Sequence, residues 1–261
     1  MPEPTTYRID RPGVATITLD APERRNSFGQ PMLKSLLAHL RQAVESEDVR
    51  VIVLTNAGTV FSAGADLKED RSSIGPGDPT FFDLVTAIDE SPKPVVGRIA
   101  GHAAGGGAAV AIACDLSVMV DTARIGITEV RLGIAPVAVA AILAHRLSPR
   151  AMFESFLAAD MMPAQRAQEL GLVNVAVAEG DLDATLDRFI DALVRGGPES
   201  LAMTKKALRA MTGRTAEENA IVAPHLVTEL THTEAQAGVA AFVNKQDAPW
   251  VPTQAGGRTG S

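Results

Sequence analysis

The sequence offers little from which a disulfide-bonded or metal-bound framework could be built. Its 261 residues include one cysteine, Cys114, so neither an intrachain disulfide nor a cysteine-based zinc cluster can form. The preceding residues, Ile112 and Ala113, are small and apolar, which indicates that Cys114 is itself a buried hydrophobic residue. We expect no metal ion in this protein.

Aromatic residues, net positive charge and long apolar runs are also scarce. Aromatics make up 4% of the chain, so a core of small aliphatic residues is expected instead of a wide ligand-stacking surface. The formal net charge of -7 argues against nucleic acid as a partner, although a local basic groove for a phosphorylated small molecule stays possible. No apolar run approaches the ~20 residues of a membrane span, and Met1–Asp10 lacks the apolar region of a signal peptide. We expect no membrane association and, by default, a cytoplasmic location.

Alternating strand and helix patterns fill the first part of the chain. The segments 7–10 and 13–19 read as a strand pair, and the four aliphatic residues 51–54 read as a strand buried on both faces. The apolar positions of 30–46 recur at helical spacing. Further expected elements are helices at 80–90, 108–114, 199–211, 216–230 and 234–245, and strands at 95–100, 116–120 and 124–127. This order predicts an α/β core followed by an α-helical tail.

Two loops rich in glycine and alanine, Phe61–Lys68 and Gly101–Gly107, are the candidates for chemistry. Each is expected at the end of a buried strand, and small residues let a ligand approach the backbone closely. A helix starting near Ala108 would present free N–H groups and positive potential to an oxyanion. Two other interpretations are tight turns without function and a nucleotide-phosphate loop. The second loop, however, lacks both the Gly-Lys-Ser/Thr ending and the usual dinucleotide fingerprint.

Several separated motifs, in order and spacing, resemble the enoyl-CoA hydratase/isomerase, or crotonase, superfamily. They are FSAGADLKE at 61–69, PKPVVGRIAGHAAGGG at 92–107, ACDLSV at 113–118, IGITEVRLGIAP at 125–136 and AQELGLVNVAV at 167–177. The resemblance covers roughly residues 5 to 250. It implies a CoA thioester as substrate and no cofactor apart from the coenzyme A of that substrate.

The resemblance also implies an architecture and an assembly. The fold would be a ClpP/crotonase-type ββα spiral core over residues 1–196, with a C-terminal α-helical trimerisation region over 197–250. The end of the chain, residues 251–261, is expected to be a disordered tail. Members of this superfamily form trimers and commonly dimers of trimers, so we expect a homotrimer or hexamer.

Site residues follow by position from the same motifs. In the family, two backbone N–H groups hold the thioester oxygen as an enolate develops, and they map to Ala65 and Gly106. Residues near the CoA moiety map to Arg24, Arg25, Ala63, Asp66, Leu67, Lys68 and Lys245. A solvated-surface interpretation of each lysine and arginine stays open.

The proton-transfer groups depart from the family pattern. Typical hydratases have two glutamates; the second is present as Glu129, but Ala109 occupies the position of the first. Val137 stands where dienoyl-CoA isomerases have an aspartate. Hydration usually divides its proton transfers between two carboxylates, so Glu129 would have to serve both as base and as acid.

Three functions remain open from the sequence. The first is an enoyl-CoA hydratase-type reaction, with branched-chain members such as the methylglutaconyl-CoA hydratase-like group as a model, because Val137 and Val139 would make a dry acyl pocket. The second is a Δ3,Δ2-enoyl-CoA isomerase, in which Glu129 alone moves one proton. The third is a non-catalytic acyl-CoA binder. His102 and His145 are candidate substitutes for the missing glutamate.

Overall fold

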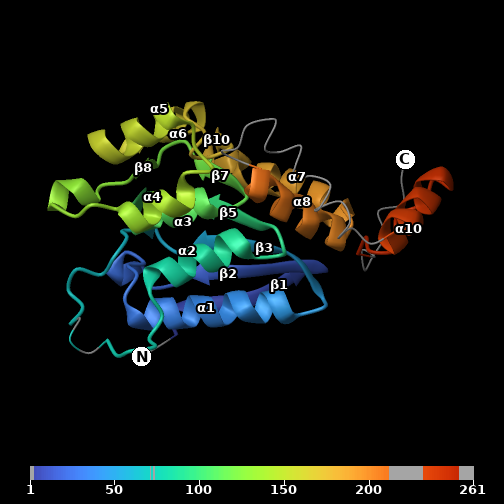
Figure 1. Ribbon diagram of the computed structural model, residues 1–261, viewed down its shortest axis with the longest axis horizontal. Helices are drawn as coiled ribbons and strands as arrows, with labels where there is room; N and C mark the ends of the chain where they lie inside the picture. The colour runs from blue at the N-terminus through green and yellow to red at the C-terminus, as the bar shows by residue number, and fades with distance from the viewer. Residues whose placement is uncertain (1–2, 71, 73, 212–231, 253–261) are drawn as a thin grey trace.

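The computed structural model describes residues 3–70, 72, 74–211 and 232–252, and it places two sheets within a layer of helices on each side (Figure 1). The larger sheet has six strands in the order β1-β2-β3-β5-β7-β10. They are β1 (Thr5–Arg11), β2 (Gly13–Leu19), β3 (Val49–Asn56), β5 (Val95–Ile99), β7 (Leu116–Val120) and β10 (Val175–Val177). The β1–β2 pair is antiparallel, and the other neighbours are parallel. The predicted α/β class is confirmed.

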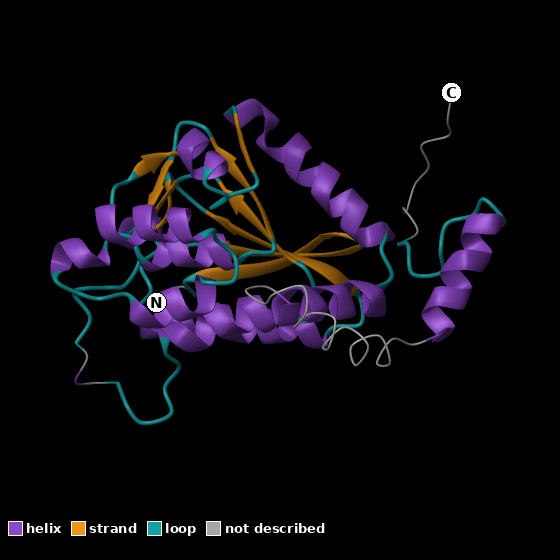
Figure 2. Cartoon of the chain, turned by 45° about the horizontal axis from the view of Figure 1, so that its top comes forward, coloured by secondary structure: helices purple, strands orange, loops and turns teal. Residues whose placement is uncertain are grey.

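Strand β3 is buried on both faces, as its run of aliphatic residues predicts. Val51 and Val53 pack in one apolar cluster with α7 (Leu182–Arg195). The alternate residues Ile52 and Leu54 belong to the larger cluster on the opposite face. That cluster also takes in α1 (Gln30–Glu45), α2 (Phe81–Glu90) and α3 (Gly106–Ala113). Figure 2 shows the sheet between these helical layers.

A second sheet carries the two candidate loops. Its order is β4-β6-β8-β9, with β4 (Val60–Ser62), β6 (His102–Ala104), β8 (Arg124–Gly126) and β9 (Met162–Pro163). The sequence predicted only loops at β4 and β6, because three-residue strands leave no periodic pattern to detect. Since β4 and β6 are parallel neighbours, the segments that follow them leave the sheet at the same edge.

The C-terminal part of the chain is mainly helical. Its two strands, β9 and β10, lie at one edge of the smaller and of the larger sheet, respectively. Its helices are α4 (Val137–Leu143), α5 (Pro149–Phe153), α6 (Ala164–Glu169), α7, α8 (Pro198–Met211) and α10 (His232–Val243). The predicted helix at 216–230 lies outside the described residues, as do residues 253–261 of the predicted tail. The described end of that tail is in contact with the body, because a carbon built on Gly13 would lie 3.0 Å from Pro252.

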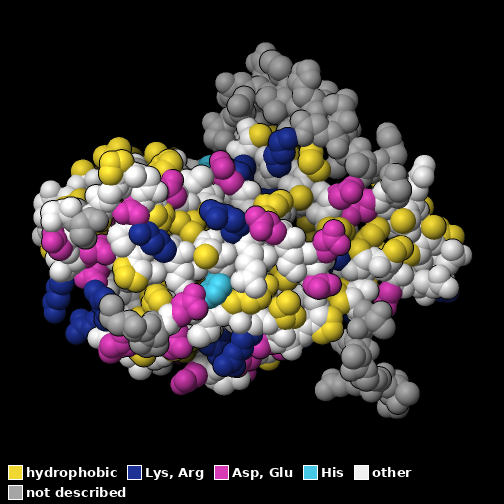
Figure 3. Space-filling model, turned by 90° about the horizontal axis from the view of Figure 1, so that it is seen from below, with side chains coloured by type: hydrophobic (Ala, Val, Ile, Leu, Met, Phe, Trp, Pro, Cys, Tyr) yellow, Lys and Arg dark blue, Asp and Glu magenta, His cyan; other side chains and the backbone are white. Residues whose placement is uncertain are grey.

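Helix α10 projects from the body at the end opposite the segment that joins β4 to α2 (Figure 1). Its side chains Val239, Phe242 and Val243 are 63%, 84% and 71% exposed. In Figure 3 acidic and basic side chains intermingle over one face of the body, and apolar side chains are visible at the α10 end. In the described ranges we find no helix with the length and apolar character needed to cross a bilayer.

Candidate active site

The first candidate loop is held by the backbone of Phe28. The Phe28 N–H donates to the Gly64 carbonyl at 2.8 Å, and the Asp66 N–H donates to the Phe28 carbonyl at 3.3 Å. This is a parallel bridge in which Ala65 is the paired residue, so its own N–H points away from Phe28. The same follows from the trans peptide, because the Ala65 N–H lies opposite the Gly64 carbonyl that Phe28 binds.

The second candidate loop is the N-terminus of α3. Gly105 precedes the helix with φ 53, a backbone conformation that favours glycine, and Gly106 is the first helical residue. The Gly105 carbonyl accepts from the Ala109 N–H at 3.1 Å, so the Gly106 N–H of the same peptide points out of the helix. The helix therefore begins two residues before the predicted start at Ala108, because the glycines themselves form its first turn.

Glycine at position 64 lets these two loops meet. Gly64 has φ +85, and a carbon built on it would lie 2.8 Å from the Ala104 oxygen and 2.9 Å from the Gly106 nitrogen. Any larger residue would push the loops apart. Within the described part of the chain, neither the Ala65 N–H nor the Gly106 N–H has a hydrogen-bond acceptor. The structure thus brings two free backbone donors to one place, at the positive end of α3.

The carboxyl group of Glu129 lies beside these donors. Glu129 opens a short 3-10 turn after β8, and a carbon built on Gly105 would lie 3.1 Å from Glu129 Oε1. Its Oε2 is buried and has no hydrogen-bond partner among the described residues. Burial raises the pKa of this carboxyl above its ordinary value, although backbone hydrogen bonds at Glu129 and Thr128 oppose the shift. A carboxyl with a buried, unpartnered oxygen at the start of a helix that presents a free N–H group is typical of an acid/base site.

None of the other candidate acid/base positions joins Glu129. Ala109 is fully buried in the apolar core. His102 accepts a hydrogen bond from the Arg124 N–H at its Nδ1, at 3.0 Å. His145 Nε2 lies 3.2 Å from Asp89 Oδ1, beyond the opposite end of α3. Among these candidates, Glu129 is therefore the one whose carboxyl lies at the start of α3.

The aspartate of the Ala-Gly-Ala-Asp motif is an internal support. Asp66 is 8% exposed, and its carboxylate accepts from Arg24, from Ser27 at 3.3 Å and from the Lys68 N–H at 3.0 Å. Burial alone would raise its pKa, but the Lys68 N–H and the Arg24 guanidinium hold it below the ordinary value. Asp66 thus ties Arg24 to the loop, and both of its oxygens are already occupied.

The remaining predicted CoA residues divide into two groups. Arg25, Ala63, Leu67 and Lys68 are exposed on or beside the first loop, together with half-exposed Arg24. Lys245 follows α10, and that helix projects at the end of the body opposite the segment that joins β4 to α2 (Figure 1). Within one chain the structure does not bring Lys245 to the others.

A pair of phenylalanine rings connects the two loops. The rings of Phe28 and Phe81 lie 5.4 Å apart between centroids, and Phe81 is the first residue of α2. A carbon built on Gly106 would lie 3.0 Å from the edge of the Phe81 ring. Phe28, whose backbone holds the first loop, therefore packs against the ring that borders the second.

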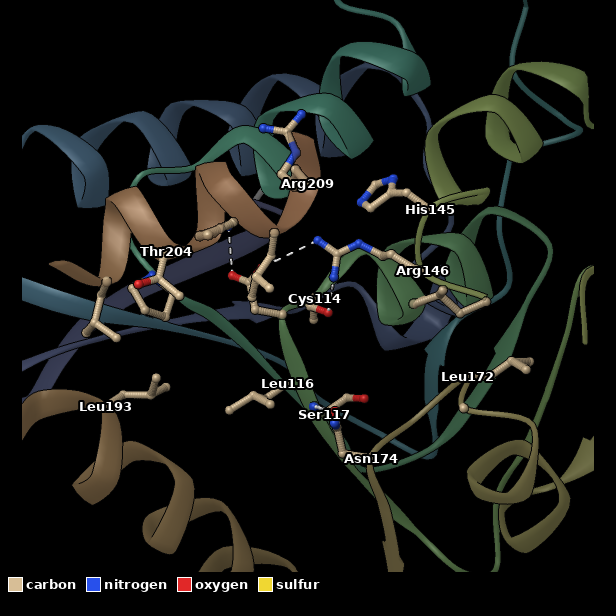
Figure 4. A pocket seen from close by; sticks show the side chains of 17 residues that line it. Cys114, Leu116, Ser117, His145, Arg146, Leu172, Asn174, Leu193, Thr204 and Arg209 are labelled. Atoms are coloured by element: carbon tan, nitrogen blue, oxygen red, sulfur yellow. Dashed lines mark hydrogen bonds and ion pairs between the residues drawn. The ribbon is translucent and has the colours of Figure 1, made fainter. Parts of the chain in front are cut away.

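A separate cavity of about 440 Å³ lies at the C-terminal end of α3 (Figure 4). Arg146 reaches across it to the Cys114 carbonyl at 3.0 Å and to Asp89 at 2.6 Å, while Lys205 of α8 pairs with Asp115 at 2.7 Å. Burial lowers the pKa of Lys205, and the Asp115 charge opposes that shift. These paired charges attach α8 to the core at the C-terminal end of α3. Since α3 has eight residues, this end lies about 12 Å from Gly106 at its N-terminus.

Comparisons with known proteins place this arrangement in a family. The sequence model of enoyl-CoA hydratase/isomerase matches residues 10–253. The chain belongs to the enoyl-CoA hydratase/isomerase family. A relative from Thermus thermophilus, named as a candidate enoyl-CoA hydratase, is 32% identical over 247 residues, covering 92% of this chain and 98% of its own. A second, enoyl-CoA hydratase domain-containing protein 3, mitochondrial, of Rattus norvegicus, is 27% identical, covering 91% and 81%.

Solved structures agree with the family's crotonase fold. The enoyl-CoA hydratase of Bacillus anthracis superposes with a TM-score of 0.85 at 26% identity, covering 95% of this chain and 99% of its own. That of Mycobacterium smegmatis gives a TM-score of 0.83 at 28% identity, covering 95% and 98%. The predicted membership of the superfamily and the predicted enzyme class are both confirmed.

Three residues that contact the two loops, Ser62, Asn26 and Phe81, were not predicted as functional from the sequence. Ser62 lies inside the motif at 61–69, and Asn26 and Phe81 lie outside the motifs, but what each contacts depends on segments far apart in the chain. Asn26 has φ 50, and asparagine tolerates that conformation better than most residues. This preference is the one local signal that could have identified any of them.

Proposed function

We propose that this protein catalyses an enoyl-CoA hydratase-type reaction in which the Ala65 and Gly106 N–H groups stabilise a thioester enolate. The observation that carries the proposal is the Glu129 carboxyl, which lies against Gly105 beside the Gly106 donor and keeps one buried oxygen without a partner among the described residues. Two preorganised backbone donors stabilise the developing charge on the thioester oxygen. The names of the relatives favour hydration over the other reactions.

In the proposed reaction Glu129 serves twice. Its carboxylate takes a proton from water as the hydroxide adds to C3 of a 2-enoyl-CoA, and the C2–C3 electron pair moves onto the thioester oxygen as an enolate. Ala65 and Gly106 hold that oxygen. The protonated Glu129 then returns its proton to C2, which gives the 3-hydroxyacyl-CoA. The raised pKa of Glu129 suits a group that must both accept and donate a proton. A branched acyl chain, as in methylglutaconyl-CoA hydratase-like enzymes, is the substrate type proposed.

Isomerisation is the second candidate, and Ala109 favours it. This residue is fully buried in the core and has no group that could hold a water for addition. Glu129 could instead remove a proton from C2 of a 3-enoyl-CoA and return it to C4, with the same enolate between. Both reactions use the same donors, so the outcome depends on whether water enters beside Glu129.

Binding of the CoA moiety is assigned to the exposed residues around the first loop. Arg24, Arg25 and Lys68 supply positive charge for phosphates, and Ala63 and Leu67 are exposed beside them. Asp66 acts by holding Arg24. Lys245 would serve a neighbouring subunit of a homotrimer or hexamer, because it is remote from the site of its own chain.

The test is incubation of the purified protein with crotonyl-CoA and, separately, with 3-hexenoyl-CoA, followed at the absorbance of the conjugated enoyl thioester. Hydration predicts a loss of absorbance with crotonyl-CoA. An isomerase would instead give a gain with 3-hexenoyl-CoA. If neither absorbance changes, and that of 3-methylglutaconyl-CoA does not change either, while acyl-CoA binds, the protein is a non-catalytic binder and the proposed function is wrong.

A further inference from the structure

We propose that Ser62 is a positioning residue that fixes the direction of the Ala65 N–H through the Gly64 turn. The inference rests on the proposed function, since it concerns the same pair of backbone donors. Ser62 is the last residue of β4, and its side chain is fully buried. Its hydroxyl therefore cannot touch substrate, and any effect on the reaction has to pass through the loop.

The Ser62 hydroxyl links the first loop to the backbone of Asn26. Its Oγ donates to the Asn26 carbonyl at 2.7 Å and accepts from the Gly64 N–H at 3.1 Å. The carbonyl of Gly64 is held separately by the Phe28 N–H at 2.8 Å. Both peptide groups of Gly64 are thus fixed, and the second of them carries the Ala65 N–H. Without the Ser62 hydroxyl, one of these two hydrogen bonds to Gly64 is lost.

Asn26 gives the serine a rigid partner. The Asn26 side chain is fully buried and makes three hydrogen bonds, from the Ala21 N–H at 2.8 Å and to the carbonyls of Ala57 and Val60 at 3.1 and 2.8 Å. Its donors and acceptor are used within the protein, and none faces a ligand. A side chain so constrained fixes the carbonyl that Ser62 binds.

Ser62 also touches the second loop. A carbon built on Gly107 would lie 2.3 Å from the Ser62 carbonyl oxygen and 2.9 Å from Ser62 Cβ. The first turn of α3 therefore packs directly on this serine. Ser62 is in contact with the segment of each donor, so it sets the position of one relative to the other.

The experiment replaces the hydroxyl and measures how strongly the donors polarise a bound carbonyl. Ser62→Ala and the size-matched Ser62→Cys are compared with Ser35→Ala, which removes another buried serine hydroxyl, bonded to Thr5 at 2.5 Å and distant from the site. The probe is butyryl-CoA labelled with ¹³C at its thioester carbonyl, which does not turn over. Its infrared stretching frequency falls when two N–H groups bind it.

We expect a smaller frequency shift in both Ser62 variants and the wild-type shift in Ser35→Ala. With the enoyl substrate, kcat should fall about tenfold or more while KM stays near the wild-type value, because misaligned donors affect the transition state most. A wild-type shift and wild-type kcat in folded Ser62→Ala or Ser62→Cys would overturn the role of Ser62. If the wild-type protein itself leaves the carbonyl frequency unshifted, the proposed pair of donors is wrong, and this proposal with it.

Discussion

Replacing Gly64 by alanine should damage the reaction far more than the fold. The substitution puts a non-glycine residue at φ +85, which costs about 1–3 kcal/mol. It also adds a carbon 2.8 Å from the Ala104 oxygen and 2.9 Å from the Gly106 nitrogen, both backbone atoms that cannot rotate away. The two donor loops must therefore separate. Loss of one such donor typically costs about 10²–10³ in kcat, or 2.7–4 kcal/mol.

The matched control is Gly171→Ala. Gly171 has φ +77, so the backbone cost is similar, but no atom lies within 4 Å of the carbon that would be added. Thermal unfolding should show a loss of stability in both variants, and a larger one in Gly64→Ala because only there does the added carbon meet backbone atoms. The absorbance assay should show wild-type kcat for Gly171→Ala and a fall of two to three orders of magnitude for Gly64→Ala. Equal kcat values in the two variants would refute the idea that the approach of the loops is required for the reaction.

Three further predictions concern Glu129, Asp89 and the assembly. Because burial raises the pKa of Glu129 above the ordinary glutamate value of 4.5, kcat/KM should begin to fall at a pH higher than 4.5 as the solution is acidified. A kcat/KM that stays constant on acidification would contradict the assignment of Glu129 as base. Asp89→Asn should cost about 3 kcal/mol in urea unfolding at pH 7, because Asp89 is 3% exposed between Arg146, His145 and Arg209. The ion pairs lower the pKa of Asp89 in the folded protein, so the Asp89 carboxylate stabilises the fold above pH 3.8, and this stabilisation is lost as the pH falls towards the lower pKa of the folded state. The difference in unfolding free energy between wild type and Asp89→Asn should therefore narrow at acidic pH. A difference that does not change with pH would argue against the ion pairs. Light scattering should give three or six times 27.3 kDa, and a mass of 27.3 kDa would exclude the trimer.

The parts of the fold that depend on local pattern could be predicted from the sequence. The helix predicted at 30–46 and the strand predicted at 51–54 are confirmed, and each of their ends agrees with the structure within two residues. Hydrophobic periodicity and burial agree in both segments. Strands β4 and β6 were missed, because three residues pair only when a distant neighbour is in place. The start of α3 was placed too late for a similar reason. Glycine has a low helix propensity, so the sequence argues against a helix at 106–107. The structure shows why glycine is present there, because Ser62 packs directly against Gly107 and leaves no room for a side chain.

For the site, the sequence located the parts but not their supports. The motifs singled out Ala65, Gly106 and Glu129, and the structure brings their segments together. The sequence could not show that Asp66 is buried beneath Arg24, because the partners are separated along the chain and an aspartate in a loop is usually exposed. Nor could it show that Lys245 lies remote from Lys68 within one chain. Both facts depend on tertiary packing.

The central claim is that Glu129 moves the proton, and Glu129→Gln tests it most directly. Glutamine keeps the size and polarity of the side chain but cannot act as a base. Glu154→Gln is the control, because Glu154 pairs with Arg166 on the surface away from α3. Turnover of crotonyl-CoA and of 3-hexenoyl-CoA is measured beside calorimetric binding of butyryl-CoA. We predict that Glu129→Gln loses turnover while binding stays close to wild type and Glu154→Gln retains both; turnover retained by Glu129→Gln would contradict the account.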